Sequence, residues 1–283
     1  MTNCPEERFD DEGAAPAWSL GLREHRGIAE ALLAAQRDRR PIDPPSALYP
    51  GLTLDDAKRI RDLGLTHRIG AGERWIGAKV SLAAPGQPVD GAPSPRLAWL
   101  TNAMLVGGDS IDVDAFAHPR LEPKLAFRLG AAITPPVMSF GKVLAATEAV
   151  HPCLEVVDSR YRIGGGLADA IADNCGTAAI VLGEGAAPPA EGRLRRLWAA
   201  LEAGYDDMPS PDEPASPPVA LGAMAWLAHQ ALEEGHLLSA GTLLVSPPIG
   251  AAARMVPGTT VTARFRGLGP IAVHLRGGRS SLS

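Results

Sequence analysis

Hydrophobic residues near the start of the chain recur with the period of a helix. The segment from Ser19 to Arg40 has apolar positions three or four residues apart, which predicts a helix that Pro41 ends. A second helix is predicted to begin after Thr53 and to run toward Ile69, because Thr53 suits an N-cap and acidic residues follow it. The first third of the chain is therefore predicted to be helical.

After Trp75 the pattern changes to short apolar runs bounded by glycine and proline, which is typical of strands. The clearest predicted strands are residues 75–82, 121–129 and 153–157. Residues 206–218 form a predicted loop, and residues 220–234 return to helical spacing. Alternating apolar positions around a Gly-Leu-Gly turn predict a final β-hairpin over residues 259–275.

Composition narrows the class of protein. The 283 residues carry a net charge of −5 and contain no dense stretch of lysine and arginine that could follow a phosphate backbone, so we expect no nucleic-acid partner. No apolar run approaches the ~20 residues that span a bilayer, and the acidic N-terminus lacks the features of a signal peptide. We therefore expect a cytoplasmic protein without membrane contact. Residues 1–17 are predicted to be flexible.

Five segments of the chain together resemble one family. They read WIGAKVSLAAP (75–85), PRLEPKLAFRLG (119–130), ATEAVHPCLEVVDSRY (146–161), IADNCGTAAIVLG (171–183) and GTTVTARFRGLGPIAVHL (258–275). Their wording and order resemble the 2-keto-4-pentenoate hydratase and 4-oxalocrotonate decarboxylase family of the fumarylacetoacetase superfamily. The resemblance implies an α+β fold, with a small helical N-terminal part over residues 18–72 and a mixed β-roll catalytic domain over residues 73–283.

The resemblance also implies a chemistry. Members of this family hydrate or decarboxylate small 2-oxo acids and 2-hydroxydienoates, and they use Mg²⁺ or Mn²⁺ held by three carboxylates. Two of these carboxylates match Glu122 and Glu155 here, and a lysine that assists at the substrate matches Lys79. The resemblance further implies a homo-oligomer.

The middle metal ligand is different in this chain. Side chains two apart on a strand point to one face, so Glu122 and residue 124 would project together, with Glu155 beside them on a neighbouring strand. Position 124 is lysine, where the family has glutamate. An ammonium cannot ligate a metal ion, and two unit charges about 4 Å apart interact by roughly 4 kcal/mol at an effective dielectric constant of ~20. We therefore expect no cofactor, or only weak binding of the family's Mg²⁺ or Mn²⁺.

Two interpretations of Lys124 remain open from the sequence. Its side chain either swings out to solvent and leaves a site with two carboxylates, or its ammonium lies between Glu122 and Glu155 in place of the ion. In the second case Lys124 would hydrogen-bond a substrate oxyanion, or act as proton donor or amine nucleophile. The predicted catalytic residues are Lys79, Lys124, Glu122 and Glu155, and the predicted metal ligands, set against Lys124, are Glu122 and Glu155.

Other positions also depart from the family pattern. Ala83 and Ala84 stand where the family has hydroxyl residues, and Ala103 stands where it has an acid. A strand-ending aspartate such as Asp158 commonly binds nearby backbone N–H groups, which is the structural alternative to a role at the substrate. The predicted substrate-binding residues are Ser81, Asn102 and Asp158.

Three functions follow from these features. The first is a lyase or isomerase that acts on a small 2-oxo acid, enol or β-dicarbonyl compound, independent of metal or only weakly dependent on it, and suited to a specialised biosynthetic step. The second is an ordinary Mg²⁺-dependent 2-hydroxydienoate hydratase or 2-oxo acid decarboxylase. The third is a non-catalytic scaffold or partner subunit, which the alanines at the expected acid and hydroxyl positions favour.

Overall fold

A computed structural model describes residues 18–82, 95–137, 139–162, 164–194, 197, 199–202, 217–265 and 267–278. Its helices are α1 (Leu22–Asp38), α2 (Pro45–Leu48), α3 (Leu54–Gly70), α4 (Phe140–Ala146), α5 (Leu167–Ala172), α6 (Glu191–Leu194) and α7 (Pro217–Glu233), with 3-10 turns η1 (Asn102–Met104), η2 (Val113–Ala115) and η3 (Asn174–Gly176). Its strands are β1 (Trp75–Ser81), β2 (Arg96–Thr101), β3 (Ser110–Asp112), β4 (Arg120–Leu129), β5 (Thr147–Val157), β6 (Thr177–Leu182), β7 (Ala199–Glu202), β8 (Leu243–Val245), β9 (Ala253–Arg254), β10 (Thr260–Phe265) and β11 (Ile271–Arg276).

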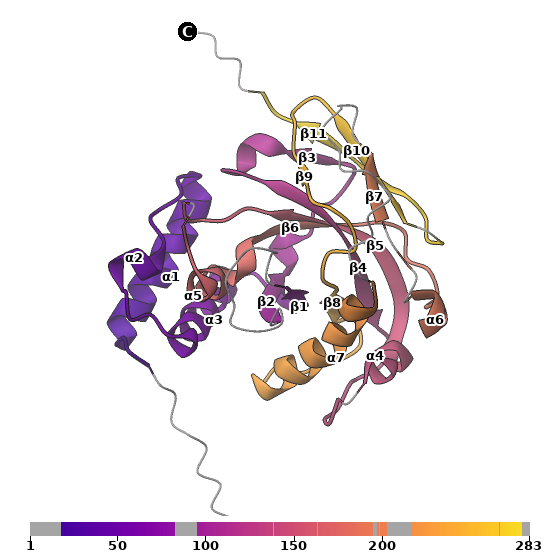
Figure 1. Cartoon of the computed structure of the whole chain (residues 1–283), viewed down its shortest axis with the longest axis horizontal. Helices are drawn as coiled ribbons and strands as arrows, with labels where there is room; N and C mark the ends of the chain where they lie inside the picture. The colour runs from indigo at the N-terminus through magenta and orange to yellow at the C-terminus, as the bar shows by residue number, and fades with distance from the viewer. Residues whose placement is uncertain are drawn as a thin grey trace, which may run out of the picture.

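Two sheets organise the molecule. The larger sheet has the strand order β2-β1-β8-β4-β5-β6, with β9 paired to β4, and it mixes parallel and antiparallel neighbours. The smaller sheet, β3-β11-β10-β7, lies above it in Figure 1, while α4 and α7 lie below. The predicted α+β class with a mixed, curled sheet is confirmed.

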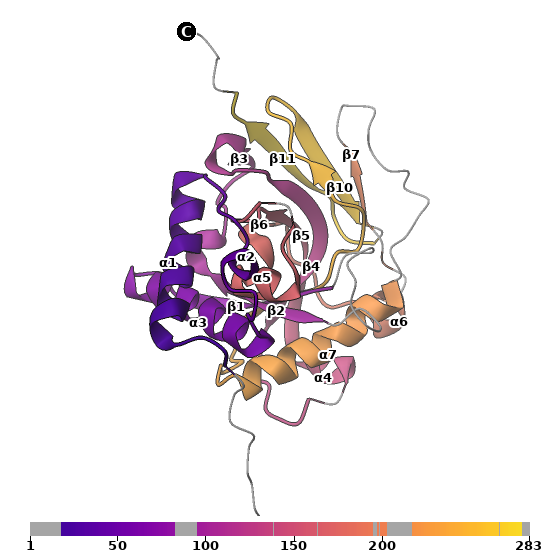
Figure 2. The same ribbon diagram turned by 60° about the vertical axis from the view of Figure 1, so that its left-hand side comes forward.

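The larger sheet closes on itself. After β2 the chain passes through η1, and Leu105 then forms a parallel bridge with Ile180 of β6, where the Val106 N–H donates to the Ile180 carbonyl at 2.9 Å. This single bridge joins the segment after β2 to the other outer strand, β6, so that the sheet curls into a roll with an interior face. Figure 2 shows the long strands β4 and β5 curving around this interior.

Strand β4 shows how the sequence creates the two faces. Odd positions from Leu121 to Leu129 are apolar, and they join the main hydrophobic core on the side of the sheet that α7 covers. Even positions carry Arg120, Glu122 and Lys124, which therefore share the other face. A strand that is apolar on one side and charged on the other can be buried on both only if the charges find partners.

The helical N-terminal part has a core of its own. Apolar residues of α1 and α3 pack with Ile171 and Ala172 of α5, which lies beside them on the left of Figure 1. The predicted helices begin and end close to the observed ones, at Leu22–Asp38 and Leu54–Gly70. The division into a separate helical part and a catalytic domain at residue 72 stays a prediction.

The start of one predicted strand differs in the structure, and some predicted features fall outside the described residues. Strand β5 begins at Thr147, not at residue 153, because the chain stays extended through the His-Pro step at 151–152 and pairs with β4 throughout. Ala83, Ala84 and most of the predicted loop 206–218 lie outside the described residues. Among the helices that are described, none has the length and apolar character needed to span a bilayer.

Asp56 connects the start of the chain to the first helix pair. Its fully buried carboxylate accepts hydrogen bonds from the backbone N–H and hydroxyl of Ser19, from those of Thr53, and from the Leu20 N–H, and it lies 2.8 Å from Nε2 of His25. Burial would raise the pKa of Asp56, but the hydrogen bonds from Thr53 and His25 outweigh it and hold the pKa well below its usual range.

We expect Asp56→Asn to lower the free energy of unfolding at neutral pH by about 3 kcal/mol, because an amide cannot accept all of these donors. A carboxyl whose pKa is depressed in the folded state stabilises the fold above its unfolded pKa of about 4, and this stabilisation is lost as pH falls toward the folded pKa. Urea unfolding of both proteins from pH 7 to pH 3 should therefore show their difference shrinking below pH 4. A difference that stays constant over this range would contradict the role of the ionised carboxylate.

Candidate active site

Strand register brings the predicted catalytic residues to one place. Glu122 of β4 lies directly opposite Glu155 of β5, and Lys124 lies opposite Cys153 in the next row of the same face. Lys79 comes from β1, separated from β4 in the sheet only by the short strand β8. All four charged side chains therefore extend from the interior face of the roll.

Glu155 is the centre of this group. One of its carboxylate oxygens pairs with the ammonium of Lys79 and the other with the ammonium of Lys124. Lys124 also lies 3.2 Å from an oxygen of Glu122. The side chains of Lys124 and Glu155 are fully buried, that of Lys79 is 1% exposed and that of Glu122 is 22% exposed. Two positive and two negative charges are thus enclosed together, with Glu122 on the solvent side.

Of the two interpretations of Lys124, the one with the ammonium between the carboxylates agrees with these contacts. The side chain does not swing out to solvent, since it is among the largest fully buried side chains of the described residues. If the ammonium left the two acids, the buried Glu155 would keep Lys79 as a partner on one oxygen but would lose the ion pair on the other, which is costly in the interior.

The two lysines differ electrostatically. Burial would lower the pKa of Lys124, but Glu155 and Glu122 outweigh it and raise that pKa above its usual range. Burial lowers the pKa of Lys79, and the charge of Lys124 acts in the same direction, although Glu155 opposes both. Burial would raise the pKa of Glu155, but Lys124 and Lys79 lower it below the usual range. Glu155 is therefore held ionised, and Lys79 is the more readily deprotonated of the two ammoniums.

A divalent ion does not fit this arrangement as it stands. Glu122 and Glu155 are the residues that would hold it, and the ammonium of Lys124 lies within ion-pairing distance of both. The described part of the chain contains no group of three or more histidine, cysteine, aspartate or glutamate side chains placed to hold a metal. An ion could bind between the two acids only if Lys124 left that position.

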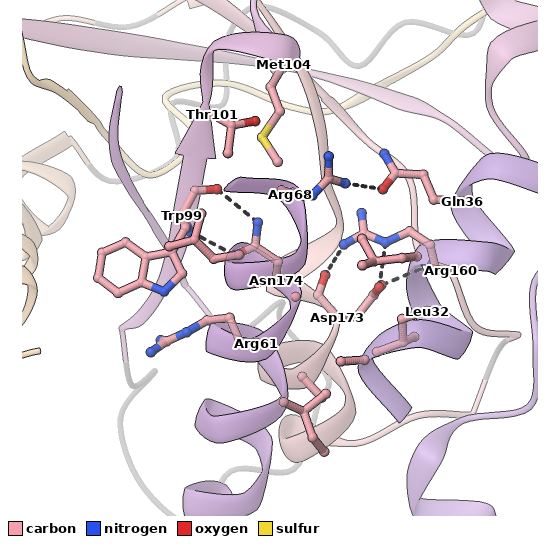
Figure 3. Close-up of a pocket in the computed structure, with 16 residues that line it drawn as sticks. Leu32, Gln36, Arg61, Arg68, Trp99, Thr101, Met104, Arg160, Asp173 and Asn174 are labelled. Atoms are coloured by element: carbon pink, nitrogen blue, oxygen red, sulfur yellow. Dashed lines mark hydrogen bonds and ion pairs between the residues drawn. The ribbon is translucent and has the colours of Figure 1, made fainter. Parts of the chain in front are cut away.

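A left-handed turn supplies the remaining partner of Lys79. Asn174, Cys175 and Gly176 all have positive φ, and the carbonyl of Cys175 accepts a hydrogen bond from the Lys79 ammonium at 3.2 Å. The Asn174 side chain holds this turn against β2: its oxygen accepts from the Trp99 N–H at 2.7 Å and its nitrogen donates to the Trp99 carbonyl at 2.9 Å (Figure 3). The strained backbone is therefore fixed where it faces the ammonium.

Arg160 and Asp173 form a second buried ion pair behind this turn. The Arg160 Nε atom lies 2.5 Å from an oxygen of Asp173, and its guanidinium also donates to the carbonyl of Thr177. Figure 3 shows this pair on the wall of a small pocket that α1 and α3 also line. The pocket has about 30 Å³, which holds about two water molecules and no substrate.

The predicted substrate-binding residues are not gathered around the lysines in one set. Both carboxylate oxygens of Asp158 accept backbone hydrogen bonds, from Ala117 at 3.0 Å and from His118 at 2.7 Å, and the side-chain oxygen of Asn102 accepts the Arg74 N–H. Ser81 shares the face of Lys79, two residues further along β1. Their roles at a substrate stay predictions.

An open cavity lies one row outward from the charged group and marks the mouth of the roll. It has about 590 Å³, and its walls include Arg120 and Val157, an opposed pair one row outward from Glu122 and Glu155. Tyr161 also lines it, and burial raises the pKa of this phenol, so that Tyr161 is a hydrogen-bond donor at neutral pH. The mouth, and not the small pocket behind the turn, has room for a small organic acid.

Sequence reasoning missed several of these groups. The Cys175 carbonyl has no side-chain signature, and two of the three left-handed residues of the turn, Asn174 and Cys175, are not glycine. Arg96, the first residue of β2, pairs with Ser81 on the face that carries Lys79. It was not singled out because strand β2 itself was not predicted. Its charge next to the proline-rich segment was the only available signal.

The chain is similar in sequence to known enzymes. No family model matches the chain. It is 32% identical over 241 residues to a 4-oxalocrotonate decarboxylase of Pseudomonas sp, covering 81% of this chain and 92% of that protein. It is 27% identical over 254 residues to a 2-keto-4-pentenoate hydratase of Paraburkholderia xenovorans strain LB400, covering 88% and 94%.

Solved structures show the same fold. The 4-oxalocrotonate decarboxylase from Pseudomonas putida G7 superposes with a TM-score of 0.80 in two complexes, one with magnesium and adipate at 24% identity and one with calcium and acetate at 25% identity. Each match covers 91% of this chain and 99% of that one. The prediction that no cofactor is expected is therefore wrong: the similar structures hold a divalent ion and point to metal dependence. The error came from inferring metal dependence from one substituted ligand.

We expect Lys124→Glu to raise the affinity for Mg²⁺ or Mn²⁺ by at least tenfold, because it exchanges a repelling ammonium for a third carboxylate. Titration calorimetry of the variant and the natural protein measures the change directly. Lys142→Glu is the matched control, since Lys142 donates to the carbonyls of Thr134 and Pro136 on another part of the surface. Equal affinities in all three proteins would contradict the placement of residue 124 at the ion's position.

Proposed function

Because this chain belongs to the family of 4-oxalocrotonate decarboxylases and 2-keto-4-pentenoate hydratases, we propose that it is a lyase acting on a small 2-oxo acid or its enol. The observation that carries this proposal is the pair of ammoniums, Lys79 and Lys124, held on one buried carboxylate in the interior of the roll. An isomerase acting on the same kind of enol, or on a β-dicarbonyl compound, uses the same groups.

Hydration and decarboxylation of such compounds share an electronic requirement. When a carboxylate leaves as CO₂, the electron pair of the broken carbon–carbon bond moves into the conjugated system and ends on the 2-oxo oxygen as an enolate. Addition of water to the conjugated double bond places charge on the same oxygen. Cationic hydrogen-bond donors fixed near that oxygen lower the barrier because they need no reorganisation as the charge develops.

Lys79 and Lys124 fit this task in different ways. Lys124, with its raised pKa, stays an ammonium and can only donate hydrogen bonds to the oxyanion. Lys79 has a lowered pKa and can release a proton more easily. In this proposal Lys124 supplies a permanent positive charge near the 2-oxo oxygen, and Lys79 also donates a hydrogen bond to that oxygen.

Glu155 and Glu122 have different roles in this proposal. Glu155 contacts both lysines and is fully buried, which makes it the residue that positions the ammoniums. Glu122 is the only one of the four with a substantially exposed side chain, so it faces an entering substrate. We assign to Glu122 the transfer of the proton to or from the substrate carbon.

Three finer predictions accompany this proposal. The chain acts in the cytoplasm, it forms a homo-oligomer, and its substrate is a small molecule. The replacement of a metal-ligand carboxylate by Lys124, and a place in a specialised biosynthetic pathway, also belong to the proposal and are supported by the sequence and by the ion pairs of Lys124.

A second candidate function has one observation in its favour. Lys79, Lys124 and Glu155 form ion pairs with one another, and none of them lines the cavity at the mouth. A non-catalytic partner subunit would retain such a group of charges, which pair with one another and do not face a cavity. For catalysis, movement of Glu122 or entry of the substrate would have to make the lysine ammoniums accessible to the substrate.

We expect the purified chain, assayed with and without added Mg²⁺, to consume a 2-hydroxydienoate or 4-oxalocrotonate, seen as loss of the conjugated ultraviolet absorbance. Lys79→Met and Lys124→Met should each lower kcat by about 100-fold or more, since each removes a donor to the enolate. Lys142→Met should leave kcat unchanged. Circular dichroism checks that each variant is folded. No turnover by the natural chain under either condition, with binding of the same compounds absent, would favour the non-catalytic function.

A further inference from the structure

Arg96 occupies a position on the interior face of the roll. It begins β2 and pairs with Ser81 of β1, while Lys79, two residues earlier on β1, pairs with Ala98. Residues two apart on a strand share a face and lie about 7 Å apart along it. Arg96 is therefore on the face that carries Lys79, one row closer to the mouth.

The guanidinium of Arg96 is buried and only partly satisfied. The residue is 7% exposed, and one terminal nitrogen donates to the Leu82 carbonyl at 2.8 Å. Its Nε atom has no hydrogen-bond partner, and no carboxylate lies within ion-pair distance of the guanidinium, among the residues that the structure describes. A buried donor left in this state is costly unless a ligand or water completes it.

Arg96 and Lys79 act on the same neighbour. Burial raises the pKa of the Cys175 thiol, and the charges of Lys79 and Arg96 both act against that rise. The Cys175 carbonyl is the hydrogen-bond acceptor of Lys79. Lys79 therefore contacts the left-handed turn, and Arg96 stands in the neighbouring row of the sheet.

Charge balance indicates what this guanidinium would bind. Lys79 and Lys124 are already neutralised by Glu155 and Glu122, so a negatively charged substrate entering the roll finds no unmatched positive charge among these four residues. Arg96 supplies one. A guanidinium presents parallel N–H groups that match the two oxygens of a carboxylate.

We propose that Arg96 binds the carboxylate of the substrate and thereby makes the site selective for 2-oxo acids over neutral ketones and β-dicarbonyl compounds. This inference rests on the proposed function, and it names the substrate class within it.

The test compares a charged ligand with its neutral ester. Pyruvate and methyl pyruvate have the same 2-oxo group, and only pyruvate has a free carboxylate. Titration calorimetry should show that Arg96→Gln binds pyruvate at least tenfold more weakly than the natural chain, with the affinity for methyl pyruvate unchanged. Arg128→Gln is the matched control, because Arg128 is exposed and pairs with Glu148 on the surface, and it should bind both compounds as the natural chain does.

A second variant covers loss of folding. Thermal unfolding identifies whether Arg96→Gln is folded, and if it is not, Arg96→Lys replaces it. Arg96→Lys keeps the charge but not the paired N–H groups, and should weaken pyruvate binding while leaving the ester unaffected. Unchanged pyruvate binding in a folded Arg96 variant would overturn the role of Arg96 alone. A natural chain that binds neither compound, and turns over neither family substrate, would overturn the proposed function itself.

Discussion

The structure depends on one buried carboxylate that is shared by two ammoniums. Glu155 lies inside a closed sheet, where an unpaired charge is not tolerated, and its two oxygens are taken by Lys79 and Lys124. These three residues come from β5, β1 and β4, so the ion pairs also connect strands that are not all neighbours in the sheet. Removal of any one charge would leave the others unbalanced in a low-dielectric interior, which ties the electrostatics of the site to the integrity of the roll.

The closure of the roll and the chemistry of the site use the same residues. Asn174 joins the turn before β6 to β2 through two hydrogen bonds to Trp99, and this attachment fixes the Cys175 carbonyl that Lys79 contacts. Behind the turn, Arg160 and Asp173 hold its other side. The segment Asp-Asn-Cys-Gly is therefore understood as a support for the lysine, and not as a source of proton-transfer groups. Its conformational strain is placed where it orients an acceptor toward a cation.

Much of the fold could be predicted from sequence because the local signals are strong. The helical periodicity of α1, the cap at Thr53 and the alternation along β4 and β10 all act within a few residues. The convergence of Glu122, Lys124 and Glu155 followed from the family resemblance and strand geometry, which fix faces but not distances. The roll closure, the left-handed turn and the place of Arg96 depend on contacts between residues far apart in the chain, such as Leu105 with Ile180. The difference in pKa between Lys79 and Lys124 likewise depends on burial and on the distance between them. Neither quantity can be derived from the residues adjacent to them in the sequence.

Charge balance explains how a lysine can stand at position 124 without disrupting the interior. In the site that the sequence resemblance implies, three carboxylates and one lysine would surround a divalent ion, and the enclosed charges would cancel. In this chain two lysines face two carboxylates, and the charges cancel again. Exchange of one carboxylate for an ammonium adds two positive charges to the enclosed group, and absence of the divalent ion removes two. The net charge of the group is therefore unchanged when the ammonium takes the place of the ion. A divalent ion bound in addition would leave two unmatched positive charges, which an anionic substrate would have to offset. In this protein, binding of a divalent ion at this position is therefore expected to depend on the negative charge that the substrate brings.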